Sequence, residues 1–233
     1  MNTDNMSILG ETFDYGPYAF METYDPNYIC NHTDSHGRYS FSNQPSIAEW
    51  NCYALASALI DLFSETELRD ILSKFNDYFY DSLIEKYRKK LGFKSPQDSD
   101  YDLLLGLFEI METEKLDYTN TFRKLSKIIS SSDNFKLSEK FSIWLASYKD
   151  RLSKDESSIE DSRTLMDKNN PKYILRNYLA QSAIEDAEQV KAEKIDELAK
   201  VLSNPYVDLG KSMEKYCQPA PKEQQNQQLS CSS

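Results

Sequence analysis

The chain has 233 residues, of which 39% are hydrophobic and 12% aromatic, which is enough for a hydrophobic core and argues against wholesale disorder. Its 38 acidic and 27 basic residues give a formal net charge of −11, so neither nucleic acid nor an anionic membrane is expected as a partner. No apolar run approaches the roughly 18 residues of a membrane-spanning helix, and the start, MNTDN, lacks the regions of a secretory signal. We therefore expect a cytoplasmic protein, or a mitochondrial one if the natural protein is eukaryotic and longer at its N-terminus.

Residues 1–44 are predicted to form a loop region with short β elements. They are rich in Asp, Asn, Gly, Pro and Tyr, which favour turns. Two apolar stretches, residues 6–10 and 12–13, are expected to form short strands between Ser7 and Asp14. These strands would bring the Asp4-Asn5 pair close to the Asp14-Tyr15-Gly16 motif.

Residues 45–204 are predicted to be mainly α-helical. Apolar residues recur at three- and four-residue steps in the segments ELRDILSKFNDYFYDSLIEKY, KLSEKFSIWLASYKDRL, NNPKYILRNYLAQSAIEDAEQ and AEKIDELAKVL. In the third segment Asn170 is the expected N-cap, with Pro171 at the first helical position. In the last two segments Ile184 and Ile195 are among the residues expected to face inward. After residue 204 the periodicity fades, so 205–233 is expected to be a flexible tail that carries Cys231.

The side chains of Asp4, Asn5 and Asp14 form the candidate catalytic set. Phosphoryl and nucleotidyl transfer need a carboxylate that orients the attacking hydroxyl and oxygen ligands that hold magnesium against the phosphates. Protein kinases place a catalytic Asp and a metal-binding Asn on one loop, followed by a metal-binding Asp before Phe-Gly. A polar loop with Asn and Asp at its turns explains the same residues, so this spacing alone leaves both interpretations open.

A longer motif follows, and it carries a family resemblance. The stretches DYGPYAFMETYDPNYICNHTDSHGRYSFSNQPSIAEWN, NPKYILRNYLAQSAIEDAE and the terminal SCSS resemble the selenoprotein O family, the YdiU-like pseudokinases. The resemblance implies a protein-kinase-like fold that binds ATP in a flipped orientation and transfers AMP to Ser, Thr or Tyr hydroxyls of proteins. It also implies that Asp4 is the general base and that Asn5 and Asp14 bind Mg²⁺, with Mn²⁺ as the alternative. Asp14 would in addition lie against the nucleotide.

The resemblance also bounds what this chain contains. In the family, the glycine-rich segment, an ATP-contacting lysine, its glutamate partner and the phosphate-binding arginines lie upstream of the MNTDN motif. We therefore expect the C-lobe of the kinase-like fold, with the N-lobe missing or supplied as a separate N-terminal half. Residues 1–44 would hold the catalytic loops and residues 45–204 the helical lobe. The alternatives are an inactive truncated remnant and a helical interaction module without chemistry.

The cysteines and two arginines complete the candidates. The four cysteines include no C-x-x-C pair, so a structural zinc site has little support. By resemblance to the family, Cys231 occupies the redox position near the C-terminus, and Cys30 is the partner with which it can form a regulatory disulfide. The alternative is a buried Cys30 and an inert Cys231. Arg38 and Arg176 could contact phosphate, but packing and ion-pair roles are expected.

Overall fold

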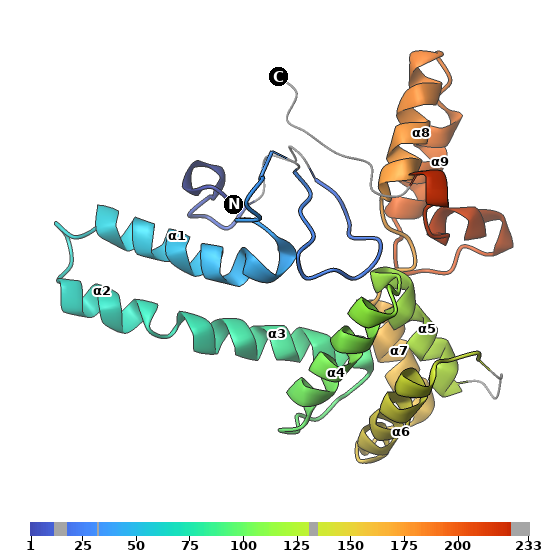
Figure 1. Ribbon diagram of the computed structural model, residues 1–233, viewed down its shortest axis with the longest axis horizontal. Helices are drawn as coiled ribbons and strands as arrows, with labels where there is room; N and C mark the ends of the chain where they lie inside the picture. Colours follow the sequence, from blue (N-terminus) through green and yellow to red (C-terminus); the bar gives the residue numbers. More distant parts are fainter. Residues whose placement is uncertain (12–17, 32, 131–134, 225–233) are drawn as a thin grey trace. The chain divides into compact units, whose positions relative to one another are not determined.

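The computed structural model describes residues 1–11, 18–31, 33–130 and 135–224 and is mainly helical (Figure 1). No strand is formed within these residues, and an isolated antiparallel bridge joins Thr23 to Asp117. Short 3₁₀ helices cover Thr3–Asn5, Phe41–Asn43, Lys211–Cys217 and Lys222–Gln224. The α-helices are α1 (Gln44–Ala58), α2 (Glu65–Leu72), α3 (Phe75–Leu91), α4 (Asp100–Thr113), α5 (Tyr118–Ser130), α6 (Glu139–Ser153), α7 (Ile159–Asn169), α8 (Asn177–Glu188) and α9 (Glu193–Leu202).

The chain divides into two compact units. The first contains Met1–Tyr18 and Asp25–Leu83, and the second contains Ala19–Tyr24 and Ile84–Gln227. The six residues Ala19–Tyr24 thus leave the first unit, pack within the second and return. We call this segment the strap. In the described part of the chain, no helix combines the length and apolarity needed to cross a membrane.

The first predicted strand, at residues 6–10, is wrong. The Gly10 N–H donates to the Ser7 carbonyl at 3.1 Å, which closes a turn, and Gly10 has a φ of +72°. Ile8 and Leu9 are each 81% exposed, so no neighbouring strand covers them. A strand needs a pairing partner, and the left-handed backbone of Gly10 interrupts the extended conformation instead. Thr12 and Phe13 lie outside the described residues.

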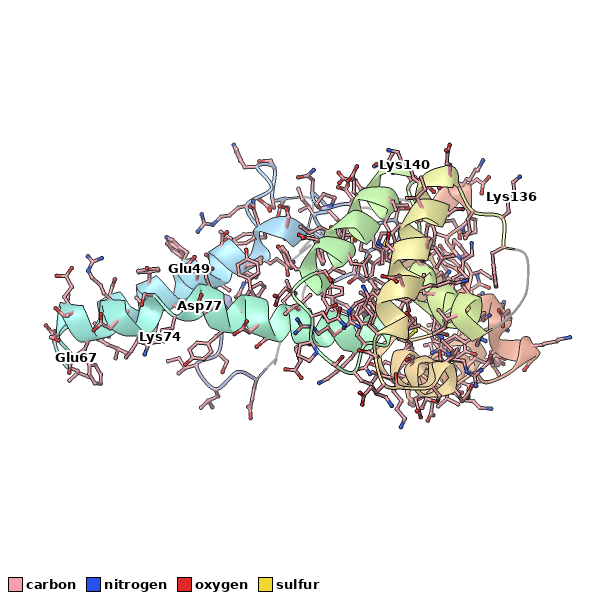
Figure 2. The ribbon with its side chains drawn as sticks, turned by 90° about the horizontal axis from the view of Figure 1, so that it is seen from below. Glu49, Glu67, Lys74, Asp77, Lys136 and Lys140 are labelled. Carbon is pink, nitrogen blue, oxygen red and sulfur yellow. The ribbon has the colours of Figure 1, made fainter. Side chains whose placement is uncertain are left out.

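The first unit is built on the hairpin formed by α1, α2 and the start of α3. Ser64 begins α2 with a capping box, since its hydroxyl accepts from the Glu67 N–H at 3.3 Å and the Glu67 carboxylate accepts from the Ser64 N–H at 3.0 Å. Asn76 of α3 donates its amide to Glu49 of α1 at 3.1 Å. Figure 2 shows exposed side chains along this hairpin, among them Glu67, Lys74 and Asp77.

The helical periodicity of residues 67–87 is divided between two helices. The Ser73 N–H donates to the Arg69 carbonyl and the Ser73 hydroxyl donates to the Asp70 carbonyl, both at 2.9 Å. This side-chain bond competes with the regular helical pattern, and the chain turns before α3 begins. Ile71 and Tyr78 are 67% and 70% exposed, so part of the predicted apolar stripe lies on the surface of the unit.

The core of the second unit lies between α4, α5, α6 and α7. Helix α5 packs against α7, and α4 packs against α6. Of the six residues in the predicted stripe of KLSEKFSIWLASYKDRL, Leu137 lies before α6 and is half-buried, and the other five are buried: Phe141, Trp144, Leu145, Tyr148 and Leu152. The Trp144 indole donates to the Leu103 carbonyl at 2.8 Å, which satisfies its polar atom within the core. Gly92 ends α3 with a φ of +80°, and a Cβ there would lie 2.9 Å from Met166.

The predicted helix start at Asn170 is wrong. Asn170 is the C-cap of α7, and α8 starts only after Arg176, its N-cap. Between the two helices, the N–H groups of Lys172 and Tyr173 donate to the Pro205 carbonyl at 2.6 and 3.1 Å. These bonds join segments more than thirty residues apart, and they override the local Asn-Pro signal.

Helices α8 and α9 pack together with part of the predicted tail. Leu198 and Val201 of α9 are buried as expected, whereas Ile184 and Ile195 are 52% and 45% exposed, contrary to the prediction. The 3₁₀ helix Lys211–Cys217 contributes buried side chains to the same cluster. The segment that follows residue 204 therefore has packed structure where the periodicity had suggested a flexible tail, and residues 225–233 lie outside the described part.

A buried ion network stabilises the second unit. Asp100 accepts from Arg151 Nε at 2.5 Å and from Arg88 Nε at 2.6 Å, and Arg151 Nη1 donates to Asp155 at 2.9 Å. The Asp100 and Asp155 side chains are fully buried, and the Arg151 guanidinium lies 4.3 Å from the centre of the Phe93 ring. These groups balance two positive with two negative charges. We call this set the Asp100 network.

Candidate functional site

Asp4 and Asn5 share one turn of 3₁₀ helix, Thr3–Asn5. The Asn5 N–H donates to the Asn2 carbonyl at 3.0 Å, which closes the turn. Both side chains are exposed, and no described residue forms a hydrogen bond with either of them. A carboxylate and an amide group are therefore both accessible from solvent on this turn, and their roles as base and metal ligand stay predictions.

The turn is anchored on both sides within the first unit. Asn51 of α1 is 6% exposed, and its amide nitrogen donates to the Met1 carbonyl at 3.0 Å and contacts the Met6 sulfur. The Tyr39 hydroxyl donates to Asn2 Oδ1 at 3.4 Å. Sequence reasoning did not single out Asn51 or Tyr39. Both lie in the long N-terminal motif, but no local pattern indicates that they reach back to residues 1–6.

The loop of residues 25–43, which we call the motif loop, is held by its own polar side chains. The Asp34 carboxylate accepts from the backbone N–H groups of Arg38 and Tyr39 at 3.0 and 2.8 Å. Gly37 has a φ of +66°, and its carbonyl accepts from the Asn43 amide at 3.1 Å. The Asp-x-x-Gly-Arg-Tyr pattern is thus explained by the turn that it forms, and that turn presents Tyr39 to Asn2, next to the Asp4-Asn5 turn.

Arg38 and Arg176 have the packing and ion-pair roles that were expected. The exposed Arg38 guanidinium lies 4.9 Å from the centre of the Trp50 ring, at a distance typical of cation–π contacts. In the second unit, Arg176 is 1% exposed and pairs with Glu22 and, at 2.8 Å, with Asp117. Sequence reasoning missed both carboxylates, because 154 residues separate Glu22 from Arg176 and no spacing rule connects them.

Comparison with known proteins identifies the family. The family model described as protein adenylyltransferase SelO matches residues 1–203, which include the Asp4-Asn5 turn, the motif loop and Arg176. The chain belongs to the SelO family. Its relatives include proteins named protein nucleotidyltransferase YdiU from Pseudomonas fluorescens strain Pf0-1 (41% identical over 240 residues), Pseudomonas aeruginosa strain PAO1 (42% over 239) and Pectobacterium carotovorum strain PC1 (40% over 239). Each match covers 100% of this chain and 49% of the relative, so the chain spans about half the length of these SelO-family proteins.

The metal site predicted for this SelO-family chain falls only in part within the described residues. Asn5, the predicted ligand within the described residues, supplies one hard oxygen donor, which fits Mg²⁺ or Mn²⁺. Among the described residues, no three His, Cys, Asp or Glu side chains gather in a way that could hold a metal ion. A cation held by Asn5 therefore needs a further ligand. The sequence assigns that role to Asp14, which lies outside the described residues.

The predicted redox pair is likewise described at one end only. Cys30 is half-buried in the motif loop, and burial raises the pKa of its thiol. A raised pKa lowers the thiolate fraction near neutral pH and with it the rate of thiol–disulfide exchange. Cys231 lies outside the described residues, so the pairing of Cys30 with Cys231 remains a prediction.

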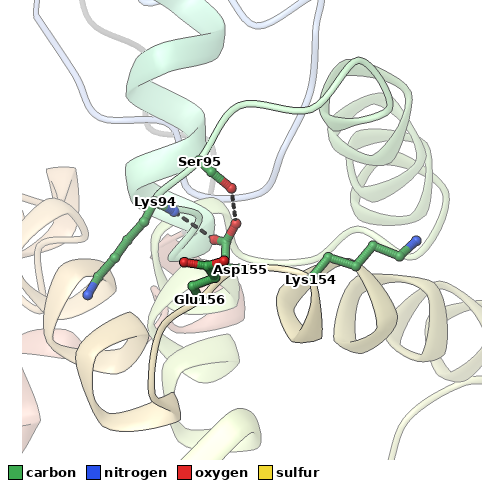
Figure 3. Close-up of a pocket in the computed structure, with 5 residues that line it drawn as sticks. All are labelled: Lys94, Ser95, Lys154, Asp155 and Glu156. Atoms are coloured by element: carbon green, nitrogen blue, oxygen red, sulfur yellow. Dashed lines mark hydrogen bonds between the residues drawn. The ribbon is translucent and has the colours of Figure 1, made fainter.

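A polar cavity of about 340 Å³ lies in the second unit, whereas the predicted catalytic residues belong to the first. It is lined by Lys94, Ser95, Lys154, Asp155 and Glu156 (Figure 3). The Asp155 carboxylate accepts from the Lys94 N–H at 2.7 Å and belongs to the Asp100 network. The ammonium groups of Lys94 and Lys154 pair with Asp161 and Asp150 and extend away from Asp155 in Figure 3. Because Asp155 and both lysines have protein partners, the cavity is a structural feature and not a second candidate active site.

Proposed function

We propose that this chain carries the general base and the metal ligands of a protein adenylyltransferase. Family membership over residues 1–203 and the names of the relatives support a nucleotidyltransferase. The observation that carries the proposal is the exposed Asp4-Asn5 turn, anchored by Asn51 and Tyr39 within the matched region. The motif resemblance supplies the finer assignment, which is transfer of AMP from ATP to Ser, Thr or Tyr hydroxyls of protein substrates.

In this proposal Asp4 accepts the proton of the attacking hydroxyl. The hydroxyl oxygen forms a bond to the α-phosphorus of ATP, the bond from that phosphorus to the bridging oxygen breaks, and pyrophosphate leaves. Asn5 and Asp14 hold the divalent cation, which supplies positive charge beside the phosphates when bound. The 3₁₀ turn fixes Asp4 next to Asn5, so the base and the first metal ligand are oriented together.

Full activity is expected to need the part of the relatives that this chain does not cover. The chain spans 49% of the relatives, and the family's triphosphate-binding residues are expected in the other half. Losing one donor that stabilises the transition state costs about 10²–10³ in rate. Losing the family's ATP-contacting lysine and all of its phosphate-binding arginines would therefore abolish measurable turnover. We therefore expect full activity only together with a polypeptide equivalent to that half. The assignment of this chain as the C-lobe of a kinase-like fold belongs to the same proposal.

The second candidate function is a helical interaction module. The connection between α1 and α2 exposes three large apolar side chains, with Ile60 56%, Leu62 75% and Phe63 49% exposed. Contiguous exposed apolar residues are typical of protein-binding surfaces. Protein binding that does not depend on nucleotide or metal, without any AMP transfer, would favour this function over catalysis.

Two further points belong to the proposal. A cytoplasmic location agrees with the absence of a membrane-spanning helix in the described residues. A disulfide between Cys30 and Cys231 would regulate the enzyme by redox state, because Cys30 lies in the same unit as the catalytic turn.

AMP transfer distinguishes these functions. The purified chain is incubated with Mn²⁺ or Mg²⁺ and with ATP labelled at either the α- or the γ-phosphate, alone and together with the half of the Pseudomonas aeruginosa relative that the chain does not cover. We expect protein labelling from the α-label only, because AMP and not phosphate is transferred. Asp14→Asn should abolish it, and Asp61→Asn, an exposed carboxylate of the first unit, is the matched control. Labelling from the γ-label would contradict AMP transfer, and equal labelling by Asp14→Asn and Asp61→Asn would contradict the metal assignment.

A further inference from the structure

The hairpin formed by α1, α2 and the start of α3 has no hydrophobic core of its own. Among residues 44–83, all of which the structure describes, only Asn51 is buried, and its side chain is polar. In the second unit, by contrast, every helix from α4 to α9 buries at least one apolar side chain. Burial of apolar surface offsets the entropy that a chain loses on folding, so this hairpin needs a further surface to cover it.

The apolar side chains of α2 and the start of α3 nevertheless form a regular stripe. They recur at three- and four-residue steps, and we call the following set the hairpin stripe: Leu68, Ile71, Leu72, Phe75, Tyr78, Phe79 and Leu83. All seven are exposed or half-buried, and the most exposed are Ile71 at 67% and Tyr78 at 70%. The same spacing in α6 places five apolar residues in a core. The hairpin stripe therefore has the pattern of a helix face that another surface covers.

The negative charge of the chain is concentrated in the same unit. The first unit holds 12 acidic and 3 basic residues, so it carries −9 of the net charge of −11. The second unit, which includes the strap, holds 26 acidic and 24 basic residues. Exposed carboxylates lie on the helices of the stripe, among them Glu67 and Asp77 in Figure 2. Two copies of this unit would repel each other, whereas a basic partner surface would be attracted.

We propose that the hairpin stripe is the docking surface for the half of the SelO-family polypeptide that this chain does not cover. Each match covers 49% of the relative, so the relatives carry a second portion of similar length in the same polypeptide. By the motif resemblance, that portion is expected to precede the MNTDN motif and so to join the first unit directly. The inference rests on family membership and not on the chemistry of AMP transfer.

The composition of the surface defines the contact. Ile71 and Tyr78 are the central apolar anchors, and truncation of such anchors weakens binding most. The acidic side chains around them require a partner surface with Lys or Arg at its rim. Rim charges act mainly on the rate of association, so this rate should fall as the salt concentration rises.

The first test locates the contact without any substitution. The full chain is co-expressed with a tagged copy of the uncovered half of the Pseudomonas aeruginosa relative, and the complex is isolated through the tag. We expect the amides of α2 around Ile71 to exchange hydrogen at least about tenfold more slowly in the complex than in the free chain, because covering the hairpin suppresses its local opening. The amides of α6 around Trp144 should be unchanged. Failure to form a complex, or a complex in which α2 exchanges as fast as in the free chain, would overturn the inference.

The second test removes the two anchors. Ile71→Ser/Tyr78→Ser leaves the helix propensity almost unchanged. The matched control is Ile143→Ser/Tyr101→Ser in the second unit, where Ile143 of α6 is 65% and Tyr101 of α4 is 40% exposed. We expect the dissociation constant of the complex to rise at least about tenfold in the hairpin variant and less than about twofold in the control. Equal changes in the two variants would overturn the inference.

A charge variant serves if the hairpin variant does not fold. Asp70→Asn/Asp77→Asn should slow association at least about threefold at low salt, whereas Asp102→Asn/Asp196→Asn, which removes two exposed carboxylates of the second unit, should leave the rate unchanged. The same association rate in both variants would overturn the inference.

Other occupants of the stripe give different results. A second copy would make the free chain a dimer in sedimentation, and the hairpin variant a monomer. Cover by another part of the same chain would lower the urea midpoint of the hairpin variant and leave the dissociation constant unchanged. Either result would overturn the inference. If the complex forms as expected but transfers no AMP, the proposed function fails and the docking surface stands.

Discussion

The Asp100 network offers the sharpest prediction about stability. The fully buried Asp100 carboxylate accepts from Arg88 and Arg151 at 2.6 and 2.5 Å and from the Gln97 N–H at 2.9 Å. Asp100→Ala removes these bonds and a further one from Arg151 Nη2 at 3.3 Å, and it leaves two guanidinium groups with only the Asp155 charge between them. The substitution therefore replaces a balanced buried network by one with an excess positive charge.

The loss in free energy of unfolding depends on which contacts Arg88 and Arg151 keep in the variant. Removing one partner of a buried ion pair typically costs about 3–5 kcal/mol. Arg151 keeps its bond to Asp155, and the Arg88 side chain is 22% exposed and can be hydrated, so we expect the lower end, about 3 kcal/mol. With an m-value of about 2 kcal/mol per M urea, this shifts the unfolding midpoint down by about 1.5 M.

The assay uses the two tryptophans of the chain. Trp50 lies in the first unit and Trp144 in the core of the second, so urea unfolding of a Trp50→Phe background reports the second unit alone. The control is Asp150→Ala, which breaks the exposed Asp150–Lys154 pair on α6 and should cost less than about 0.5 kcal/mol. If Asp100→Ala shifts the midpoint no further than Asp150→Ala does, the reasoning about buried charge in this unit is refuted.

Three further predictions concern the acid stability of the second unit, the capping box of α2 and the Asn51 contact with residue 1. Burial opposes the charged forms of Asp100 and Asp155, but their hydrogen bonds and arginine partners outweigh it and lower both pKa values, so the stabilisation is present above a pH of about 4 and is lost as the pH falls through the folded-state values. In Asp100→Ala the free energy of unfolding of the second unit should therefore fall less steeply with acid, and an unchanged pH profile in urea unfolding would contradict this. Ser64→Ala removes the capping box of α2 and should cost about 1 kcal/mol, seen as about fivefold faster hydrogen exchange in α2, whereas unchanged exchange would argue against the cap. Asn51→Leu removes the donor to the Met1 carbonyl and should speed exchange at the amide of Asn5 while α2 is unaffected; equal exchange in the variant would show that Asn51 does not anchor the turn.

The parts of the fold that local patterns specify could be predicted from the sequence. The stripe residues that lie within α6 are buried, because apolar residues that repeat at helical spacing need only a neighbouring helix. The helix start at Asn170 could not be predicted, because Lys172 and Tyr173 find their backbone acceptor at Pro205. The failed strand at residues 6–10 has the same origin, since a strand depends on a partner that local sequence does not reveal.

The candidate site shows the same division. The sequence named Asp4 and Asn5 as the candidate base and metal ligand, and the structure shows that they share one exposed 3₁₀ turn; their chemical roles stay predictions. The anchoring of this turn by Asn51, and the pairing of Arg176 with Glu22, depend on contacts between residues 45–154 positions apart. Such contacts are set by tertiary packing, so no spacing rule could have found them.

The central claim is that Asp4 accepts a proton during AMP transfer. The most direct measurement is the initial rate of AMP transfer from α-labelled ATP by wild type and Asp4→Asn, each complemented by the half of the relative that this chain does not cover. General base catalysis contributes about 10²–10⁴-fold, so the account predicts a loss of at least about a hundredfold in Asp4→Asn at saturating Mn²⁺. A rate within about twofold of the wild type would contradict it, since the contribution of a general base lies far outside that range.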